Sequence, residues 1–217
     1  MAEKLVTKND LLNKLRAYKD TPDDENISYK NKIKKALLSN PCLLYALNEE
    51  SLESELFDDD GNINWEWNEE KKEYEPLGEW DRYFGSNSNI RPFLFIPDTQ
   101  TEVKHYICYQ VSFQDTVRYQ PGLKDTLITF NIFVHGNDRM DKLTGVPRHD
   151  LIASIIRERF AWSNIFGMQT YLVSDRESTT DNNYLVRTLV FQLTDLNSKV
   201  QTPYGGKTSK VNFQVRR

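Results

Sequence analysis

The chain has 217 residues, with 28 basic and 32 acidic side chains and a formal net charge of −4, and its mean hydropathy of −0.66 is polar. Aromatic residues nevertheless make up 12% of it, which is too many for a disordered chain, so we expect one folded domain with polar extensions. No apolar run is long enough for a membrane span, the N-terminus lacks the apolar region of a secretion signal, and Cys42 and Cys108 are too few for a disulfide framework. These features predict a protein of a reducing cytoplasm that does not enter a membrane.

Charge is distributed unevenly along the chain. Residues 1–48 carry 9 basic and 6 acidic side chains, residues 49–81 carry 2 and 14, and residues 82–217 carry 17 and 12. No acidic residue follows Asp195. Charge and element pattern together predict four segments: a helical N-terminal segment (1–48), an acidic insert (49–89), an α+β core domain (90–195) and a basic C-terminal tail (196–217).

The first segment has the pattern of helices. Thr7 and Asp10 have the spacing of a capping box, with Asp in place of the usual Glu. An apolar face follows at Leu11, Leu12, Leu15 and Tyr18. A second helix is expected from Pro22, and Asn40-Pro41 separates it from a short buried helix at 42–47.

Strand patterns follow the acidic insert. Residues 91–97 are a short apolar run bounded by prolines, which favours an edge strand. Residues 103–119 and 126–135 alternate between apolar and polar side chains, and the Pro121-Gly122 turn between them predicts an antiparallel pair.

The sequence pattern in the last third of the chain predicts a helix and two more strands. Pro147 stands in the first turn of the helix. Strands are expected at 168–173 and 184–193, joined by a polar linker at 174–183. The order β-β-β-α-β-β predicts an α+β fold in which an antiparallel or mixed sheet packs on helices, preceded by the helical segment and the acidic aromatic insert.

Two patterns are compatible with metal chemistry. Asp98, Glu102 and Lys104 mimic a nuclease motif in which two carboxylates hold Mg²⁺. Both acids fall in one turn, however, so a polar turn that enters a strand is the simpler interpretation. A second pattern has the spacing of a calcium loop: Asp58, Asp60, Asn62, Asn64 and Glu69. Ile63 stands where that loop needs glycine. We therefore expect a solvated turn there, and no cofactor or metal.

The histidines and aromatic residues have both structural and functional interpretations. His105 and His135 would meet across paired strands. The acidic insert carries an aromatic cluster: Trp65, Trp67, Tyr74, Trp80 and Tyr83. Local packing on the sheet is its simplest interpretation, a protein interface is the second, and a sugar-stacking platform is the third. Its acidic surroundings would repel a nucleic-acid backbone.

The positively charged residues that could form a binding surface lie on the predicted helix and in the tail. They are Arg148, Arg157 and Arg159 on the helix, and Lys199, Lys207, Lys210, Arg216 and Arg217 in the tail. A solvated helix face and a frayed tail form one interpretation, and a docking surface for an acidic neighbour is the other. The tail also alternates Val211, Phe213 and Val215, which suits a strand added to a partner.

The order of these elements resembles the tail-completion, or tail-terminator, proteins of tailed bacteriophages. The similarity covers roughly residues 100–195. It rests on the long strand pair, the helix with Leu151, Ile155, Ile156 and Phe160, the Phe166-Gly167 turn and the hairpin that follows. The N-terminal helices and the 49–89 insert depart from the compact pattern of that family.

The resemblance implies a non-enzymatic virion protein of the tail or neck, assembled in the cytoplasm of the bacterial host. Such a protein would form a homo-oligomeric ring, with six copies expected, that ends the tail tube and joins it to the head connector. Its implied partners are other copies of itself, the tail tube protein and the neck proteins, while genomic DNA passes without specific binding. The alternatives are a metal-dependent nuclease that uses Asp98, Glu102 and Lys104, and a carbohydrate-binding module that uses Trp65, Trp67 and Trp80.

Overall fold

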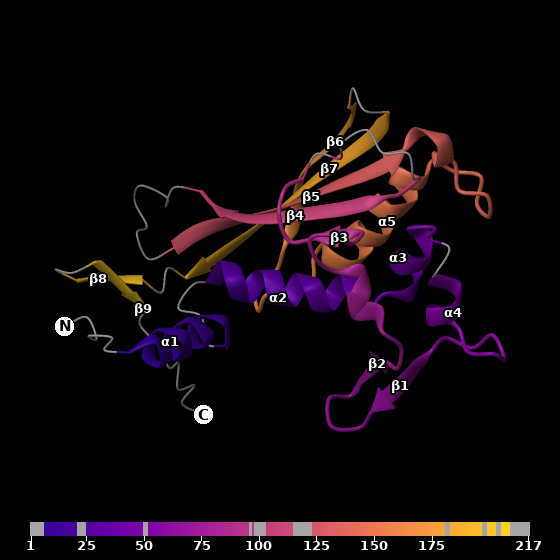
Figure 1. Ribbon diagram of the computed structural model, residues 1–217. Helices are drawn as coiled ribbons and strands as arrows, with labels where there is room; N and C mark the ends of the chain where they lie inside the picture. The colour runs from indigo at the N-terminus through magenta and orange to yellow at the C-terminus, as the bar shows by residue number, and fades with distance from the viewer. Residues whose placement is uncertain are drawn as a thin grey trace, which may run out of the picture.

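A computed structural model describes residues 7–20, 25–49, 52–95, 97, 103–114, 123–180, 183–196, 199–202 and 205–208. Its centre is a five-stranded sheet with the strand order β3-β4-β5-β7-β6 (Figure 1). The strands are β3 (Ile90–Arg91), β4 (Tyr106–Phe113), β5 (Leu123–His135), β6 (Tyr171–Thr179) and β7 (Tyr184–Leu196). All neighbours pair antiparallel except β3, which runs parallel to β4. The predicted α+β fold with its β-β-β-α-β-β body is confirmed.

Helices pack on one face of this sheet and form the main core with it. α2 (Glu25–Leu38) and α5 (Arg148–Phe160) contact the strands, whereas α3 (Pro41–Ala46) packs on these two helices and α4 (Glu53–Leu56) packs on α3. The ring of Phe130 on β5 lies 4.9 Å from Phe160 on α5 and 5.8 Å from Phe191 on β7. Ile33 and Leu44, from the helical N-terminal segment, belong to the same buried cluster. The division of the chain into four segments stays a prediction.

Strand alternation divides the side chains of the sheet between two environments. On β4, Ile107 and Tyr109 face the helix-covered core, as their alternation predicted. Tyr106 and Cys108 face the other side, in a smaller cluster that includes Tyr184 of β7. The alternating pattern therefore predicted correctly which side chains of this strand share a face.

Two strand predictions were wrong. The apolar run 91–97 was expected to be a strand, but β3 ends at Arg91, because Pro92 has no N–H to donate to a ladder. The polar stretch 174–183 was expected to be a linker, but β6 continues to Thr179 and pairs with β7 along that length. Polar side chains are tolerated there because β6 is an edge strand and Asp175 forms ion pairs with Arg157 and Arg187.

The remaining elements lie around this body. They are α1 (Lys8–Asp20), the hairpin β1 (Trp65–Asn68) and β2 (Glu73–Pro76), η2 (Trp80–Tyr83), η3 (Gly136–Asp138), and the hairpin β8 (Lys199–Thr202) and β9 (Gly205–Thr208). The predicted capping box begins α1: the Thr7 N–H donates to Asp10 at 2.9 Å and the Asp10 N–H donates to the Thr7 hydroxyl at 3.2 Å. In the described parts of the chain, no helix combines the length and apolar content needed to cross a membrane.

Candidate subunit interface

The loop between η3 and α5 presents apolar side chains to solvent. In residues 139–147, called the apolar loop below, Met140 is 47% exposed, Leu143 81% and Val146 41%. Figure 1 shows this loop projecting beyond the end of the sheet. Single exposed apolar residues are ordinary, whereas three within seven positions of one projecting loop make that loop a candidate contact surface. The sequence reasoning missed this surface. The available signal was apolar residues recurring in a turn-rich stretch before Pro147.

Hydrogen bonds within the apolar loop fix its shape. The Asp141 N–H donates to the Val146 carbonyl at 2.9 Å, and the Gly145 N–H donates back to the Asp141 carbonyl at 2.9 Å. One oxygen of the Asp141 carboxylate accepts from the N–H of Thr144 at 2.9 Å and from its hydroxyl at 2.7 Å. Gly145 has a φ of +71°, which favours glycine at that turn. Hydrogen bonds within the loop itself therefore fix the course of its backbone.

Arg148 anchors the base of the apolar loop from inside the protein. Its guanidinium donates to Asp141 at 3.3 Å, to the Asp138 carboxylate at 3.2 Å and to the Ala46 carbonyl of α3 at 3.1 Å. Only 2% of Arg148 is exposed. The prediction that Arg148 contributes to a positive outer surface is therefore wrong: α5 turns this side chain inward, where two carboxylates neutralise it.

His105 continues this buried network onto the sheet. Its Nδ1 accepts the His135 N–H at 3.1 Å, and its Nε2 lies 2.9 Å from Asp138 Oδ2. Because Nδ1 acts as an acceptor, Nε2 carries the proton and donates it to Asp138. The Asn48 amide donates to the same carboxylate oxygen at 2.6 Å. The predicted meeting of His105 and His135 is confirmed as a contact between the His105 ring and the His135 main chain, and it holds the end of β5 that leads through η3 to the apolar loop.

The buried network shifts the pKa of its members in a consistent direction. Burial lowers the pKa of His105 and outweighs the hydrogen bond to Asp138, which acts to raise it. Burial by itself would raise the pKa of Asp138, but hydrogen bonds from His105 and Asn48 and the charge of Arg148 leave it lowered. The folded network therefore favours a neutral His105 beside an ionised Asp138.

We expect the free energy of unfolding to decline in two steps on acidification. Below about pH 6.5, unfolded His takes up a proton that folded His105 resists. Below about pH 4, unfolded carboxyls take up protons that Asp138 resists. His105→Gln should flatten the first decline, whereas the second should persist because Asn48 and Arg148 still lower the pKa of Asp138. Denaturant unfolding across this pH range measures both, and a first decline that is unchanged in the variant would contradict the assignment.

The other two predicted helix arginines differ from each other. Arg157 Nη1 lies 2.6 Å from Asp175 Oδ2 on β6, and Arg187 Nε of β7 lies 2.6 Å from the other oxygen of that carboxylate. The hydrogen bond from Arg187 is the main cause that lowers the pKa of Asp175. Arg157 is thus engaged within the chain. Arg159 is exposed and lines a groove.

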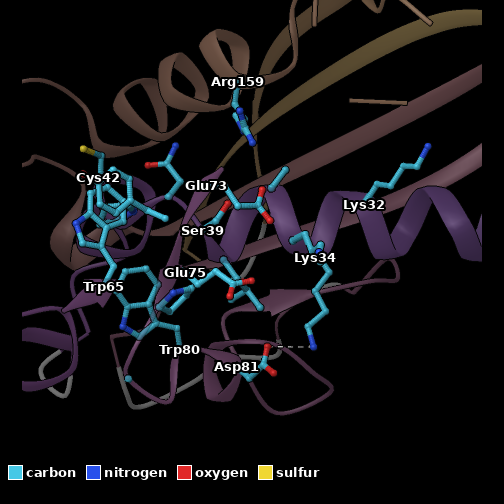
Figure 2. Close-up of a pocket in the computed structure, with 18 of the residues that line it drawn as sticks. Lys32, Lys34, Ser39, Cys42, Trp65, Glu73, Glu75, Trp80, Asp81 and Arg159 are labelled. Carbon is cyan, nitrogen blue, oxygen red and sulfur yellow. Dashed lines mark ion pairs between the residues drawn. The ribbon is translucent and has the colours of Figure 1, made fainter. Parts of the chain in front are cut away.

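This groove is a second candidate surface and lies between α2 and the β1–β2 hairpin (Figure 2). Its volume is about 1580 Å³. Basic side chains from the helices line it: Lys32, Lys34, Lys35 and Arg159. Acidic side chains from the hairpin and the segment after it face them: Glu73, Glu75, Glu79 and Asp81. One ion pair joins the two sides, Lys34 Nζ to Asp81 Oδ1 at 3.1 Å.

The predicted aromatic cluster divides between the core and this surface. Trp80 is 1% exposed and its indole N–H donates to the Glu55 carbonyl at 3.0 Å, while Tyr83 is 3% exposed. Trp80 and Tyr83 are therefore core residues, and their prediction as interface residues is corrected. Trp65 is half-buried, stacked on Tyr74 with the ring centroids 4.7 Å apart, and Trp67 is 42% exposed. The three tryptophans do not form one sugar-stacking platform, because Trp80 is buried.

The tail residues are described only in part. Lys199 begins β8 and Lys207 lies on β9, which pair as an antiparallel hairpin. The other predicted tail residues, Lys210, Phe213, Arg216 and Arg217, lie outside the described residues, as do Val211 and Val215.

The metal patterns receive no support from the described residues. Asp98 and Glu102 lie outside them, and Lys104 Nζ lies 4.0 Å from Glu49 Oε1. In the predicted turn, Asp58 accepts from the N–H of Asn62 at 2.8 Å and from its side-chain amide at 3.1 Å. Across the described parts of the chain, no group of three or more His, Cys, Asp or Glu side chains is arranged to hold a metal ion.

A comparison with protein families matches residues 40–193 to a family model described as YomW, a name that states no function. The matched part begins at the N-cap of α3 and ends within β7. It contains the apolar loop, the β1–β2 hairpin and the buried network around Arg148. A search of the curated proteins finds no match.

Proposed function

We propose a function for this chain, which belongs to the YomW family: it is a structural protein of a phage tail or neck. It forms a ring that ends the tail tube and joins it to the head connector. Its partners are other copies of itself, in a ring for which we expect six, together with the tail tube protein and the neck proteins. It acts in the virion after assembly in the bacterial cytoplasm, and it is not an enzyme.

The apolar loop is the observation that carries this proposal. Exposing Leu143 to water at 81% is unfavourable unless a partner covers it. The loop is nonetheless built with internal hydrogen bonds and anchored by a buried arginine. A rigid apolar anchor of this kind suits the centre of a protein interface, where a few such residues supply most of the binding energy.

The placement of elements suits a ring. A ring needs two different surfaces on each subunit, one that contacts the preceding copy and one that contacts the next. In Figure 1 the apolar loop lies at one end of the sheet, and α1 with the β8–β9 hairpin lies at the other. Leu11 and Leu15 of α1 are 44% and 56% exposed. These apolar positions at the far end give the loop of a neighbouring copy a surface to contact.

The charge distribution fits the proposed passage of DNA. The acidic stretch 49–81 and the net charge of −4 do not favour binding to a phosphate backbone. No described contact favours the nuclease or the carbohydrate-binding alternative over this proposal.

Leu143→Ser is expected to weaken self-association by at least about tenfold in dissociation constant, as loss of a central anchor does. Lys142→Ser, at the neighbouring exposed position, is the matched control and should change it less than about twofold. Mass photometry over a concentration series measures both. Assembly that is equally strong in both variants would exclude the apolar loop from the interface, and a chain that stays monomeric at every concentration would contradict the ring.

A further inference from the structure

Arg91 is a buried cation on the side of the sheet away from the main core. It ends β3, whose register with β4 pairs Ile90 with Ile107 and Arg91 with Cys108. Ile90 belongs to the main core, and because side chains alternate along a strand, the next residue points to the opposite side. Arg91 therefore lies on the same side as Cys108, which belongs to the smaller cluster, and it is only 7% exposed.

One carbonyl and two aromatic rings contact the Arg91 guanidinium. Its Nε donates to the Ser88 carbonyl at 2.9 Å. Its Cζ lies 3.8 Å from the centroid of the Phe95 ring and 4.7 Å from that of the Tyr106 ring. The two centroids are only 5.5 Å from each other, which is too close for rings on opposite faces of one guanidinium. The rings therefore meet on one side of it and leave its other side without a ring.

Arg91 differs from Arg148, the other deeply buried arginine, in its counter-charge. Arg148 is 2% exposed and faces the carboxylates of Asp138 and Asp141. Within the described part of the chain, no carboxylate forms an ion pair with Arg91, and its two Nη groups donate no hydrogen bond. The attraction of a guanidinium to aromatic rings is small beside the cost of burying an unpaired charge. The burial of Arg91 is therefore unfavourable until a ligand supplies a negative charge.

The charge of Arg91 acts on the groups around it. Burial raises the pKa of the Cys108 thiol to about 11, and the positive charge of Arg91 opposes that rise. Burial also raises the pKa of the Tyr184 hydroxyl to about 12, and Arg91 opposes this rise too. Tyr184 and Cys108 belong to the same small apolar cluster. This cluster therefore lies in a positive field that attracts an anion.

We propose that Arg91 binds the carboxylate of a ligand with an apolar body. This site goes beyond the proposed function and exists in a single subunit. The two Nη groups of a guanidinium hold two carboxylate oxygens in one plane. One negative charge balances Arg91, whereas the second charge of a phosphate would stay unpaired beside the apolar cluster. Phe93 and Leu94, which follow Arg91 closely in the chain, are 40% and 52% exposed and give the apolar body a surface to contact.

Calorimetric titration of the full-length protein with sodium benzoate tests this site, with acetate and phosphate compared at the same ionic strength. We expect one benzoate per chain, bound more tightly than acetate or phosphate. Arg91→Lys should weaken benzoate binding at least about tenfold, because an ammonium group lacks the planar fork. Arg159→Met, at an exposed position, should change it less than about twofold. The absence of benzoate binding, equal binding by Arg91→Lys, or phosphate bound as tightly as benzoate would overturn the proposal.

Arg91→Met provides a second test that begins without ligand. In chloride buffer, replacing an unpaired buried charge with an apolar side chain of similar size should leave the midpoint of thermal unfolding unchanged or raise it. Benzoate at ten times its dissociation constant should raise the midpoint of the unsubstituted protein by about 3 °C and leave that of Arg91→Met unchanged. A lower midpoint for Arg91→Met in chloride would show that the guanidinium serves the fold alone, and would overturn the proposal, as would an equal response of both proteins to benzoate.

Discussion

Arg148→Met is expected to lower the free energy of unfolding by about 3–5 kcal/mol, the usual cost of removing one partner from a buried ion pair. Arg148 is 2% exposed and faces both Asp138 and Asp141. Its loss leaves two carboxylates near the core without their counter-charge. In a chain of this length, the midpoint of thermal unfolding should fall by roughly 10 °C.

The same substitution should also release the base of the apolar loop, because Arg148 holds Asp141, whose carboxylate organises the loop through Thr144. Arg159→Met, at an exposed position on the same helix, is the matched control and should change stability by no more than about 0.5 kcal/mol. Denaturant unfolding of both variants measures the difference. Equal stabilities would contradict the buried network.

Trp80→Ala should lower the free energy of unfolding by about 3–5 kcal/mol, as truncation of a large core aromatic residue does. Trp80 is 1% exposed, and its indole N–H satisfies the Glu55 carbonyl of α4. The truncation leaves a cavity and removes one of the two donors to the Glu55 carbonyl, the other being the Asn64 amide at 3.3 Å. The β1–β2 hairpin, which lies between α4 and η2 in sequence, should lose its support.

Trp67→Ala is the control of the same residue type, since Trp67 is 42% exposed. It should cost less than about 1 kcal/mol in stability. Urea unfolding separates the two tryptophans. A stable Trp80→Ala protein with a destabilised Trp67→Ala protein would reverse their assignment to core and surface.

Most of the body could be predicted from the sequence because its strands alternate cleanly. The alternation at 103–119 and 126–135 predicted the strands β4 and β5 and divided their side chains between the two faces of the sheet. The spacing of the apolar residues after Pro147 predicted the helix α5. The stretch 174–179 could not be recognised as a strand in this way. Its Asp175 forms ion pairs with Arg157 and Arg187, and these partners come from other elements of the chain.

The candidate interface was harder to predict, because burial of a charged or aromatic side chain depends on partners that sequence spacing does not reveal. Arg148 and Arg159 occupy the same helix and have the same chemistry, yet one is buried by Asp138 and Asp141 and the other is exposed. Trp80 and Trp67 differ in the same way. The apolar loop was missed because its short apolar spacing has neither helical nor strand periodicity.

The length of tail tubes polymerised with and without this protein tests the central claim most directly. Tail tube protein would be assembled alone, with the full-length chain, and with the Leu143→Ser variant, and the lengths of the tubes would be measured in electron micrographs. We predict that the full-length chain stops elongation and leaves a ring at one end of each tube, and that the variant does so poorly. Tubes that grow to the same length in all three samples, with bare ends, would contradict a role in ending the tail tube.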